Sequence, residues 1–109
     1  MNYKDLPKIK TKIEYLEISV ENWGRQIKNI ERFQPDSSLV RDYTKHQADA
    51  IEEIRKLQQQ REDIIAEMDM NERTKAVLLM HYDAGMKWQE IADREGVSIR
   101  QIHRIRKQV

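Results

Sequence analysis

Apolar residues recur along the first third of the chain at alternating intervals of three and four positions. These intervals place them on one face of an α-helix, and such a sustained repeat is typical of a helix that packs against a partner helix. Pro7 falls in the first turn, where its missing N–H costs no hydrogen bond. We therefore predict a long amphipathic helix with an apolar stripe of Leu6, Ile9, Ile13, Leu16, Val20, Trp23, Ile27 and Ile30.

The pattern breaks at residues 33–38, and a second stripe with the same intervals follows. Pro35 restricts the residue before it to extended geometry, and several polar residues after it can cap a new helix. Two helices of similar length joined by a short loop fold back antiparallel, each about 40 Å long. We therefore predict a coiled-coil-like antiparallel hairpin over residues 1–69. Its second stripe consists of Val40, Tyr43, Gln47, Ala50, Ile54, Leu57, Arg61, Ile64 and Met68.

Two polar residues, Gln47 and Arg61, interrupt this second stripe, whereas Ile51 and Ile65 widen it. Polar seam residues can fix register or oligomeric state, or they can lie at a loosened rim. The apolar surface exceeds what one helix pair covers, and an isolated hairpin of this length is marginally stable. We expect self-association, with a homodimer in a four-helix bundle as the simplest form. Packing within one chain and docking on a partner such as RNA polymerase are the alternatives.

Residues 70–109 carry the pattern of a three-helix domain. Ala76–Met80 is apolar nearly all round, which indicates a buried helix, and Asp69 or Asn71 can cap it. Residues 88–109 then have the spacing of a helix-turn-helix. The sequence therefore predicts an all-α protein, in which a long helical hairpin precedes a three-helix helix-turn-helix domain.

The special positions of this motif hold residues that suit them. Ala92 is small where the two helices cross closest, Gly96 tolerates the positive φ of the turn, and Ser98 can cap the second helix. Two isoleucines three positions apart turn an apolar stripe inward and leave the other face of the second helix free. The face expected to be free carries Ser98, Ile99, Arg100, Gln101, His103, Arg104 and Lys107.

Charge is distributed unevenly along the chain. The net charge is +1 overall, but it is −2 over residues 1–69 and +3 over residues 70–109. Between Gly96 and Val109 there are four Lys/Arg residues and no acid. A basic excess on a helix-turn-helix favours DNA binding. The structural alternative is an ordinary helix with basic residues at its C-terminus, where cations favour the helix dipole.

Several function classes find no support in the sequence. There is no phosphate-binding or dinucleotide-binding glycine motif, and His46, His81 and His103 share no metal-ligand spacing, so we expect no enzyme, cofactor or metal. We expect His46 on a solvated helix face, His81 packed, and His103 on the DNA side. The chain has no cysteine, no apolar run of ~18 residues and no signal-peptide core, so we expect a cytoplasmic location.

Residues 71–82, 85–92 and 96–105 resemble the −35-reading domain, region four, of bacterial sigma factors. They resemble more closely the small phage and prophage regulators that carry this domain after a helical part, including the ArpU-type and RinA-type late-gene activators. The sequence departs from the family at Lys87, where a capping Ser or Thr is usual, and at Ile99, where a polar residue is usual.

The resemblance implies that the second helix of the motif, about residues 99–107, enters the DNA major groove. Arg100 and Arg104 are the expected guanine contacts because a guanidinium can bond O6 and N7 together. The residues expected to face bases are Ser98, Ile99, Arg100, Gln101, His103 and Arg104. Those expected to neutralise phosphates are Arg94, Arg106 and Lys107.

The hypothesis that the sequence favours is a sequence-specific, phage-type transcription regulator that binds double-stranded DNA, in the cytoplasm of a bacterial host. It would act as a homodimer through its N-terminal helices, and RNA polymerase is a further candidate partner. One alternative is a DNA-packaging or architectural protein such as a small terminase subunit, although the DNA-binding unit there is usually N-terminal. The other is a polymerase-binding interaction protein that does not itself read DNA.

Overall fold

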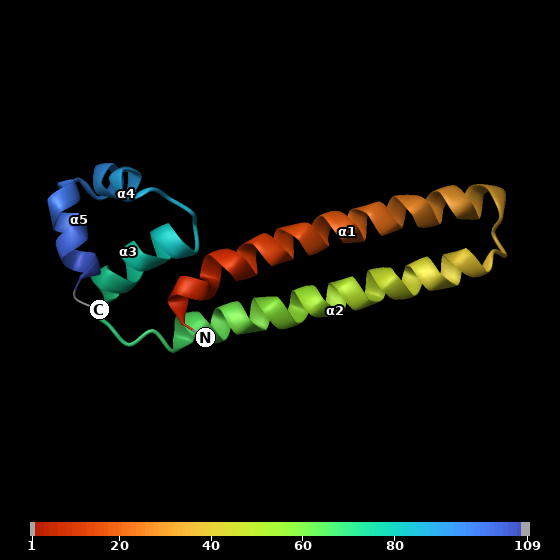
Figure 1. Ribbon diagram of the computed structural model, residues 1–109, viewed down its shortest axis with the longest axis horizontal. Coiled ribbons are helices and arrows are strands. Elements are labelled where there is room, and N and C mark those ends of the chain that lie inside the picture. The colour runs from red at the N-terminus through yellow and green to blue at the C-terminus, as the bar shows by residue number, and fades with distance from the viewer. Residues whose placement is uncertain (1, 108–109) are drawn as a thin grey trace. The chain divides into compact units, whose positions relative to one another are not determined.

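The computed structural model describes residues 2–107, which contain helices and no strand (Figure 1). This confirms the all-α fold class expected from the two periodic stripes and the helix-turn-helix spacing. None of the helices in the described range is long and apolar enough to cross a membrane. The elements are a 3-10 helix η1 (Tyr3–Asp5) and the α-helices α1 (Leu6–Phe33), α2 (Ser38–Ala66), α3 (Glu72–Tyr82), α4 (Trp88–Glu95) and α5 (Ile99–Arg106).

The chain forms two compact units. One, the hairpin unit, comprises residues 11–60. The other, the head unit, comprises the residues up to Lys10 together with those from Arg61 onward. The head is thus larger than the 70–109 segment that the sequence pattern delimits, because the start of α1 and the end of α2 also belong to it.

In the hairpin unit, α1 and α2 run antiparallel and are joined by residues 34–37 (Figure 1). The Oγ of Ser37 accepts a hydrogen bond from the N–H of Leu39 at 3.2 Å, and the Ser37 carbonyl accepts from Val40. Ser37 is therefore the capping residue among the polar candidates that follow Pro35.

The seam of the hairpin unit is only half covered. Every stripe side chain from Ile13 to Ile30 and from Val40 to Ile54 is half-buried, and only Leu57 of this unit is buried. Two helices cannot enclose a stripe on both flanks, so the seam keeps contact with solvent. Five large apolar side chains are exposed outright: Tyr15, Ile18, Phe33, Leu39 and Ile51.

The polar seam residue Gln47 has a specific partner on the facing helix. Its Nε2 donates to the carbonyl oxygen of Val20 at 3.1 Å. A Cβ built on Gly24 would lie 3.2 Å from that nitrogen, closer than most Cβ contacts, so the glycine leaves room for the amide. Gln47 and Gly24 together favour one register of α1 against α2.

The head unit is built around α3. Thr74, Val77 and Leu78 of this helix are buried, whereas Ala76 is exposed, so α3 is less completely enclosed than its apolar run suggests. Asn71 caps the helix by accepting from the N–H of Thr74 at 2.8 Å. The core cluster of this unit consists of Val77, Ile91, Ala92 and Ile102, with Met80, Met86, Trp88, Val97, Ile99 and Ile105 packed against it.

The N-terminal residues of the chain contribute to the head unit. Tyr3 of η1 meets Tyr82 of α3 edge to face, with ring centroids 5.2 Å apart. Leu6 and Ile9, at the start of α1, are 1% and 4% exposed, and Ile64, near the end of α2, is 5% exposed. The head therefore buries apolar residues from three separate stretches of sequence.

A two-pronged ion pair lies within the head unit. Arg61 Nε and Nη2 donate to the two carboxylate oxygens of Asp83 at 2.8 and 2.7 Å. These hydrogen bonds raise the pKa of Arg61 above its ordinary value. Arg61, a polar exception in the second stripe, thus has a partner at the C-terminus of α3.

Candidate nucleic-acid interface

The turn between α4 and α5 has the geometry that its residues predict. Gly96 adopts φ +67°, and its N–H bonds back to carbonyl oxygens of the last turn of α4. Ala92 is fully buried at the crossing of the two helices, as is Ile91 beside it. The expected roles of Ala92 and Gly96 are confirmed.

The N-terminus of α5 is closed by a reciprocal pair of hydrogen bonds. Ser98 Oγ accepts from the N–H of Gln101 at 3.2 Å, and Gln101 Oε1 accepts from the N–H of Ser98 at 3.1 Å. This is a capping box, which satisfies two backbone donors at the helix start. By contrast, Lys87 makes no side-chain cap for α4; there only Glu90 reaches back, to the Lys87 N–H at 3.3 Å.

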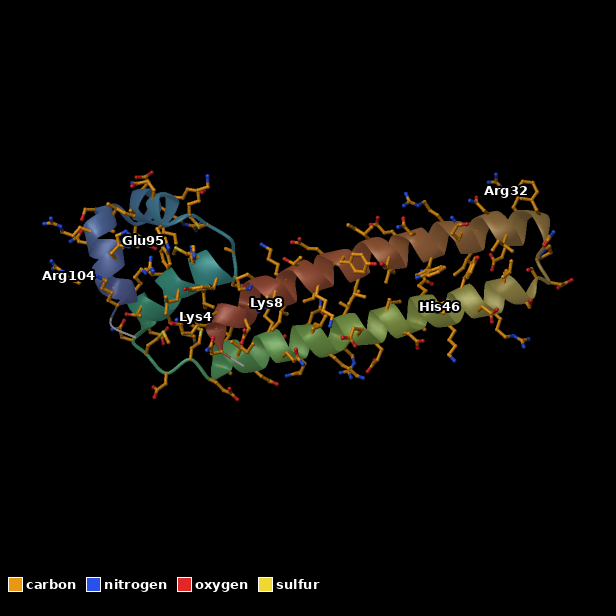
Figure 2. The ribbon with its side chains drawn as sticks, in the orientation of Figure 1. Lys4, Lys8, Arg32, His46, Glu95 and Arg104 are labelled. Carbon is orange, nitrogen blue, oxygen red and sulfur yellow. The ribbon has the colours of Figure 1, made fainter. Side chains whose placement is uncertain are left out.

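The inward face of α5 fixes which face is free. Ile102 is fully buried and Ile105 is half-buried against the core cluster. Arg100, Arg104 and Lys107 are consequently exposed, and Figure 2 shows Arg104 pointing away from the body of the head. Within residues 2–107, neither these three cations nor Arg94 on α4 forms an ion pair, so their charges are available to an anionic partner.

Ser98 and Gln101 are exposed, as base-facing residues must be, but their oxygens are already engaged in the capping box. An amide reads adenine by accepting and donating at once. Because Gln101 Oε1 bonds to Ser98, its NH₂ group remains the part that can meet a base without opening the helix cap.

Ile99 is less exposed than we expected from the sequence. It is half-buried and packs against the core cluster. The physical reason is its spacing, because Ile99 is three residues before Ile102 and so lies on the same side of α5. Only part of its side chain is left for a base edge.

Arg106 and His103 belong to an aromatic cluster in the head. The guanidinium of Arg106 lies over the indole of Trp88, 4.6 Å from the ring centroid, and its Nη1 is 3.5 Å from Nδ1 of the half-buried His103. His81 stacks on the same indole at 3.8 Å and 15°, with Nδ1 2.8 Å from the carbonyl oxygen of Met86. These contacts connect α3, the start of α4 and the end of α5.

From the sequence, we expected Arg106 to contact a phosphate, and Trp88 had no role beyond being the first residue of the helix-turn-helix segment 88–109. The contact between them joins residues eighteen positions apart and depends on how α4 and α5 cross. An aromatic residue at the start of one helix and an arginine at the end of the next were the available signal. His81 is packed, as expected, and its partner is Trp88.

His46 is exposed, as expected, and its ring lies 5.1 Å from that of Trp23 in the hairpin unit. Among residues 2–107, no three His, Asp or Glu side chains are grouped so as to hold a metal ion.

Comparison with known proteins supports the geometry of the head. Residues 69–109 match the family model of a homeodomain-like domain. The matched segment contains α3, α4 and α5, so the family match and the helix arrangement agree on a helix-turn-helix-like domain in this part of the chain. Searches of the curated proteins and of the solved structures found no match to the chain.

Proposed function

We propose that this protein is a sequence-specific DNA-binding transcription regulator of the phage or prophage type. The observation that carries the proposal is the free cationic face of α5 on a helix-turn-helix: Arg100, Arg104 and Lys107 are exposed and unpaired within the described residues. The phage type rests on the resemblance of residues 71–82, 85–92 and 96–105 to sigma region four-like regulators. Such a regulator works in the cytoplasm of the bacterial host.

In the proposed complex, α5 lies in the major groove. Arg100 and Arg104 are one helical turn apart, about 6 Å along the axis at ~1.5 Å per residue. That separation allows each guanidinium to address its own guanine. Arg94 and Lys107 approach the phosphates on either side and fix the helix in the groove.

The regulator is proposed to act as a homodimer through the hairpin. The half-covered seam and the exposed Tyr15, Ile18 and Ile51 support self-association, because a second hairpin would cover surface that α1 and α2 leave open. Two heads on one dimer would read two half-sites, as dimeric helix-turn-helix proteins do. RNA polymerase is a further proposed partner of the DNA-bound form.

Fluorescence anisotropy with DNA selected from a random pool tests the proposal. Arg100→Ala and Arg104→Ala are each expected to lower affinity for the selected site by about 1–3 kcal/mol while leaving non-specific binding nearly unchanged. Arg41→Ala, an exposed arginine on the hairpin, is the matched control and should bind like the wild type.

Two outcomes contradict a sequence-reading regulator. Enrichment of no sequence, with affinity that is equal for all DNA, indicates a packaging or architectural role. Absence of DNA binding by the wild type, together with retention of RNA polymerase, indicates an interaction protein.

A further inference from the structure

Helix α1 carries an uncharged stripe beside its apolar seam. Its members recur at intervals of four and three, which places them along one flank of the helix. Of the nine other non-seam positions from Glu14 to Arg32, seven are charged, whereas none of the stripe is. The stripe, called the amide stripe below, consists of Tyr15, Ser19, Asn22, Gln26, Asn29 and Phe33.

The other flanks of the hairpin unit do not share this composition. The opposite flank of α1 carries Glu17, Glu21, Lys28 and Glu31. On α2, both flanks of the seam hold charged residues, Asp42 and Asp49 on one side and Arg41 and Arg55 on the other. Charge is depleted at the centres of protein interfaces, where aromatic residues are enriched. The amide stripe shares the depletion of charge, and its aromatic residues lie at its two ends.

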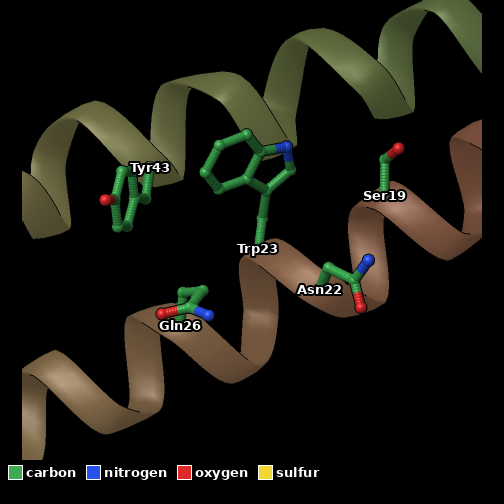
Figure 3. A pocket seen from close by; sticks show the side chains of 5 residues that line it. All are labelled: Ser19, Asn22, Trp23, Gln26 and Tyr43. Atoms are coloured by element: carbon green, nitrogen blue, oxygen red, sulfur yellow. The ribbon is translucent and has the colours of Figure 1, made fainter.

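The amide stripe also borders a groove. Ser19, Asn22 and Gln26 line it from α1, and the rings of Trp23 and Tyr43 form its aromatic part, with centroids 5.0 Å apart (Figure 3). At the two ends of the stripe, Tyr15 is 69% and Phe33 is 78% exposed. Exposed aromatic ends on either side of an amide centre give this flank a surface that another helix can cover.

We propose that the amide stripe is the surface through which a second copy of this chain docks, with the two α1 helices antiparallel about a two-fold axis. The proposal rests on the self-association in the proposed function and adds the face and direction of packing. An isologous contact requires each residue to suit its symmetry mate. With the axis midway between Asn22 and Gln26, Tyr15 of one copy meets Phe33 of the other, Ser19 meets Asn29, and Asn22 meets Gln26.

The chemistry of these pairs suits a two-fold contact. Each amide offers both donors and an acceptor, so Asn22 of one copy can bond to Gln26 of the other across the axis. Arg25 donates to the Oδ1 of Asn22 within α1, which leaves the NH₂ group of Asn22 for the other copy. The aromatic residues Tyr15 and Phe33 meet at both ends, and no member of the stripe carries a charge.

Disulfide trapping tests the face and the direction together. The chain has no cysteine, so each introduced thiol is unique. Asn22→Cys and Gln26→Cys chains, distinguished by a size tag and mixed under mild oxidation without DNA, should form the mixed crosslink several-fold more than either self-crosslink. In the proposed packing, the thiol at position 22 of one copy lies opposite the thiol at position 26 of the other, within disulfide reach. Two thiols at position 22, or two at position 26, are instead displaced by about 6 Å along the α1 axis.

Glu17→Cys mixed with Glu31→Cys is the control, because these residues are also placed symmetrically about the axis but lie on the charged flank. It should not crosslink above background. Predominant self-crosslinking of Asn22→Cys means parallel packing and overturns the proposal, as does equal crosslinking of the control pair.

Light scattering measures dimerisation and so tests the amide stripe independently of DNA binding. Asn22→Arg should raise the dimer dissociation constant at least about tenfold because like charges then lie near the axis, whereas Glu21→Arg should leave it unchanged. A wild-type monomer overturns both the stripe and the proposed dimer. A dimer that survives Asn22→Arg overturns the stripe alone, and specific DNA binding by the head is scored independently of either result.

Discussion

The cations of α5 differ in what surrounds them. Arg100 and Arg104 are exposed and meet no carboxylate among the described residues, so they can bind DNA without losing a protein partner. Arg106 instead lies over the Trp88 ring. A cation on an aromatic face is held by the ring quadrupole, at about 0.5–1 kcal/mol when exposed. The sequence assigned Arg100 and Arg104 to bases and Arg106 to a phosphate, and the structure adds that only Arg106 has an aromatic partner among the three.

This difference predicts unequal salt dependence. Lys107→Gln should reduce the slope of log affinity against log salt by about 0.9, because one phosphate contact is lost. Arg106→Gln should leave the slope nearly unchanged while weakening binding, because it removes the Trp88 contact that holds α5 against α4. Titrations at several salt concentrations measure both, and equal slope changes would assign Arg106 to the phosphates instead.

The Arg61–Asp83 pair predicts a modest effect on stability. Arg61→Gln should lower the free energy of unfolding by about 1 kcal/mol, the upper end for partly exposed pairs, because the contact is two-pronged. Lys12→Gln, which removes a single longer contact of 3.6 Å to Glu53, is the control and should change it by less. Urea unfolding at low and high salt checks this; a loss that salt does not diminish would rule out an ionic origin.

Single elements were predictable where their pattern is local. The stripes at intervals of three and four gave α1 and α2, and Gly96 and Ser98 marked the turn before α5. Ile99 shows the limit of local reasoning. Its place at the helix start suggested exposure, but its interval to Ile102 turns it toward the core.

Two residues before α5, Gly96 in the turn and Ser98 at the helix cap, are each expected to contribute to the stability of the fold. Ser98→Ala should destabilise the protein by about 1 kcal/mol, because the Gln101 N–H loses its side-chain acceptor. Gly96→Ala should cost about 1–2 kcal/mol from backbone strain at φ +67° alone, since a Cβ there meets no atom within 4 Å. Thermal unfolding by circular dichroism measures both. Wild-type stability for Gly96→Ala would contradict the left-handed turn.

At the scale of the whole molecule, the head unit is where sequence reasoning fell shortest. The periodic stripe assigned Leu6, Ile9 and Ile64 to the hairpin seam, yet the structure assigns them to the compact unit that contains the helix-turn-helix. A periodicity reveals that a face is buried but not which distant element covers it. The exposure of Arg100, Arg104 and Lys107 could be predicted because it depends on one helix, whereas the Trp88 cluster depends on three.

This arrangement predicts that the head depends on both ends of the hairpin. Leu6→Ala should destabilise the chain by about 2–5 kcal/mol, because it leaves a cavity at a site that is 1% exposed. Ile18→Ala, at an exposed site on the same helix, should change stability by about 0.5 kcal/mol or less. Urea unfolding compares them, and a fragment of residues 69–109 as stable as the full chain would contradict a head completed by its N-terminal residues.

Methylation interference on a site selected from random DNA shows whether α5 reads bases in the major groove. Methylation of guanine N7 lies in that groove, and methylation of adenine N3 lies in the minor groove. If α5 reads bases in the major groove, particular N7-methylated guanines will block wild-type binding, and Arg100→Ala and Arg104→Ala will each lose sensitivity at a different one. Interference confined to adenine N3, or a guanine pattern unchanged in both variants, would contradict major-groove reading by α5.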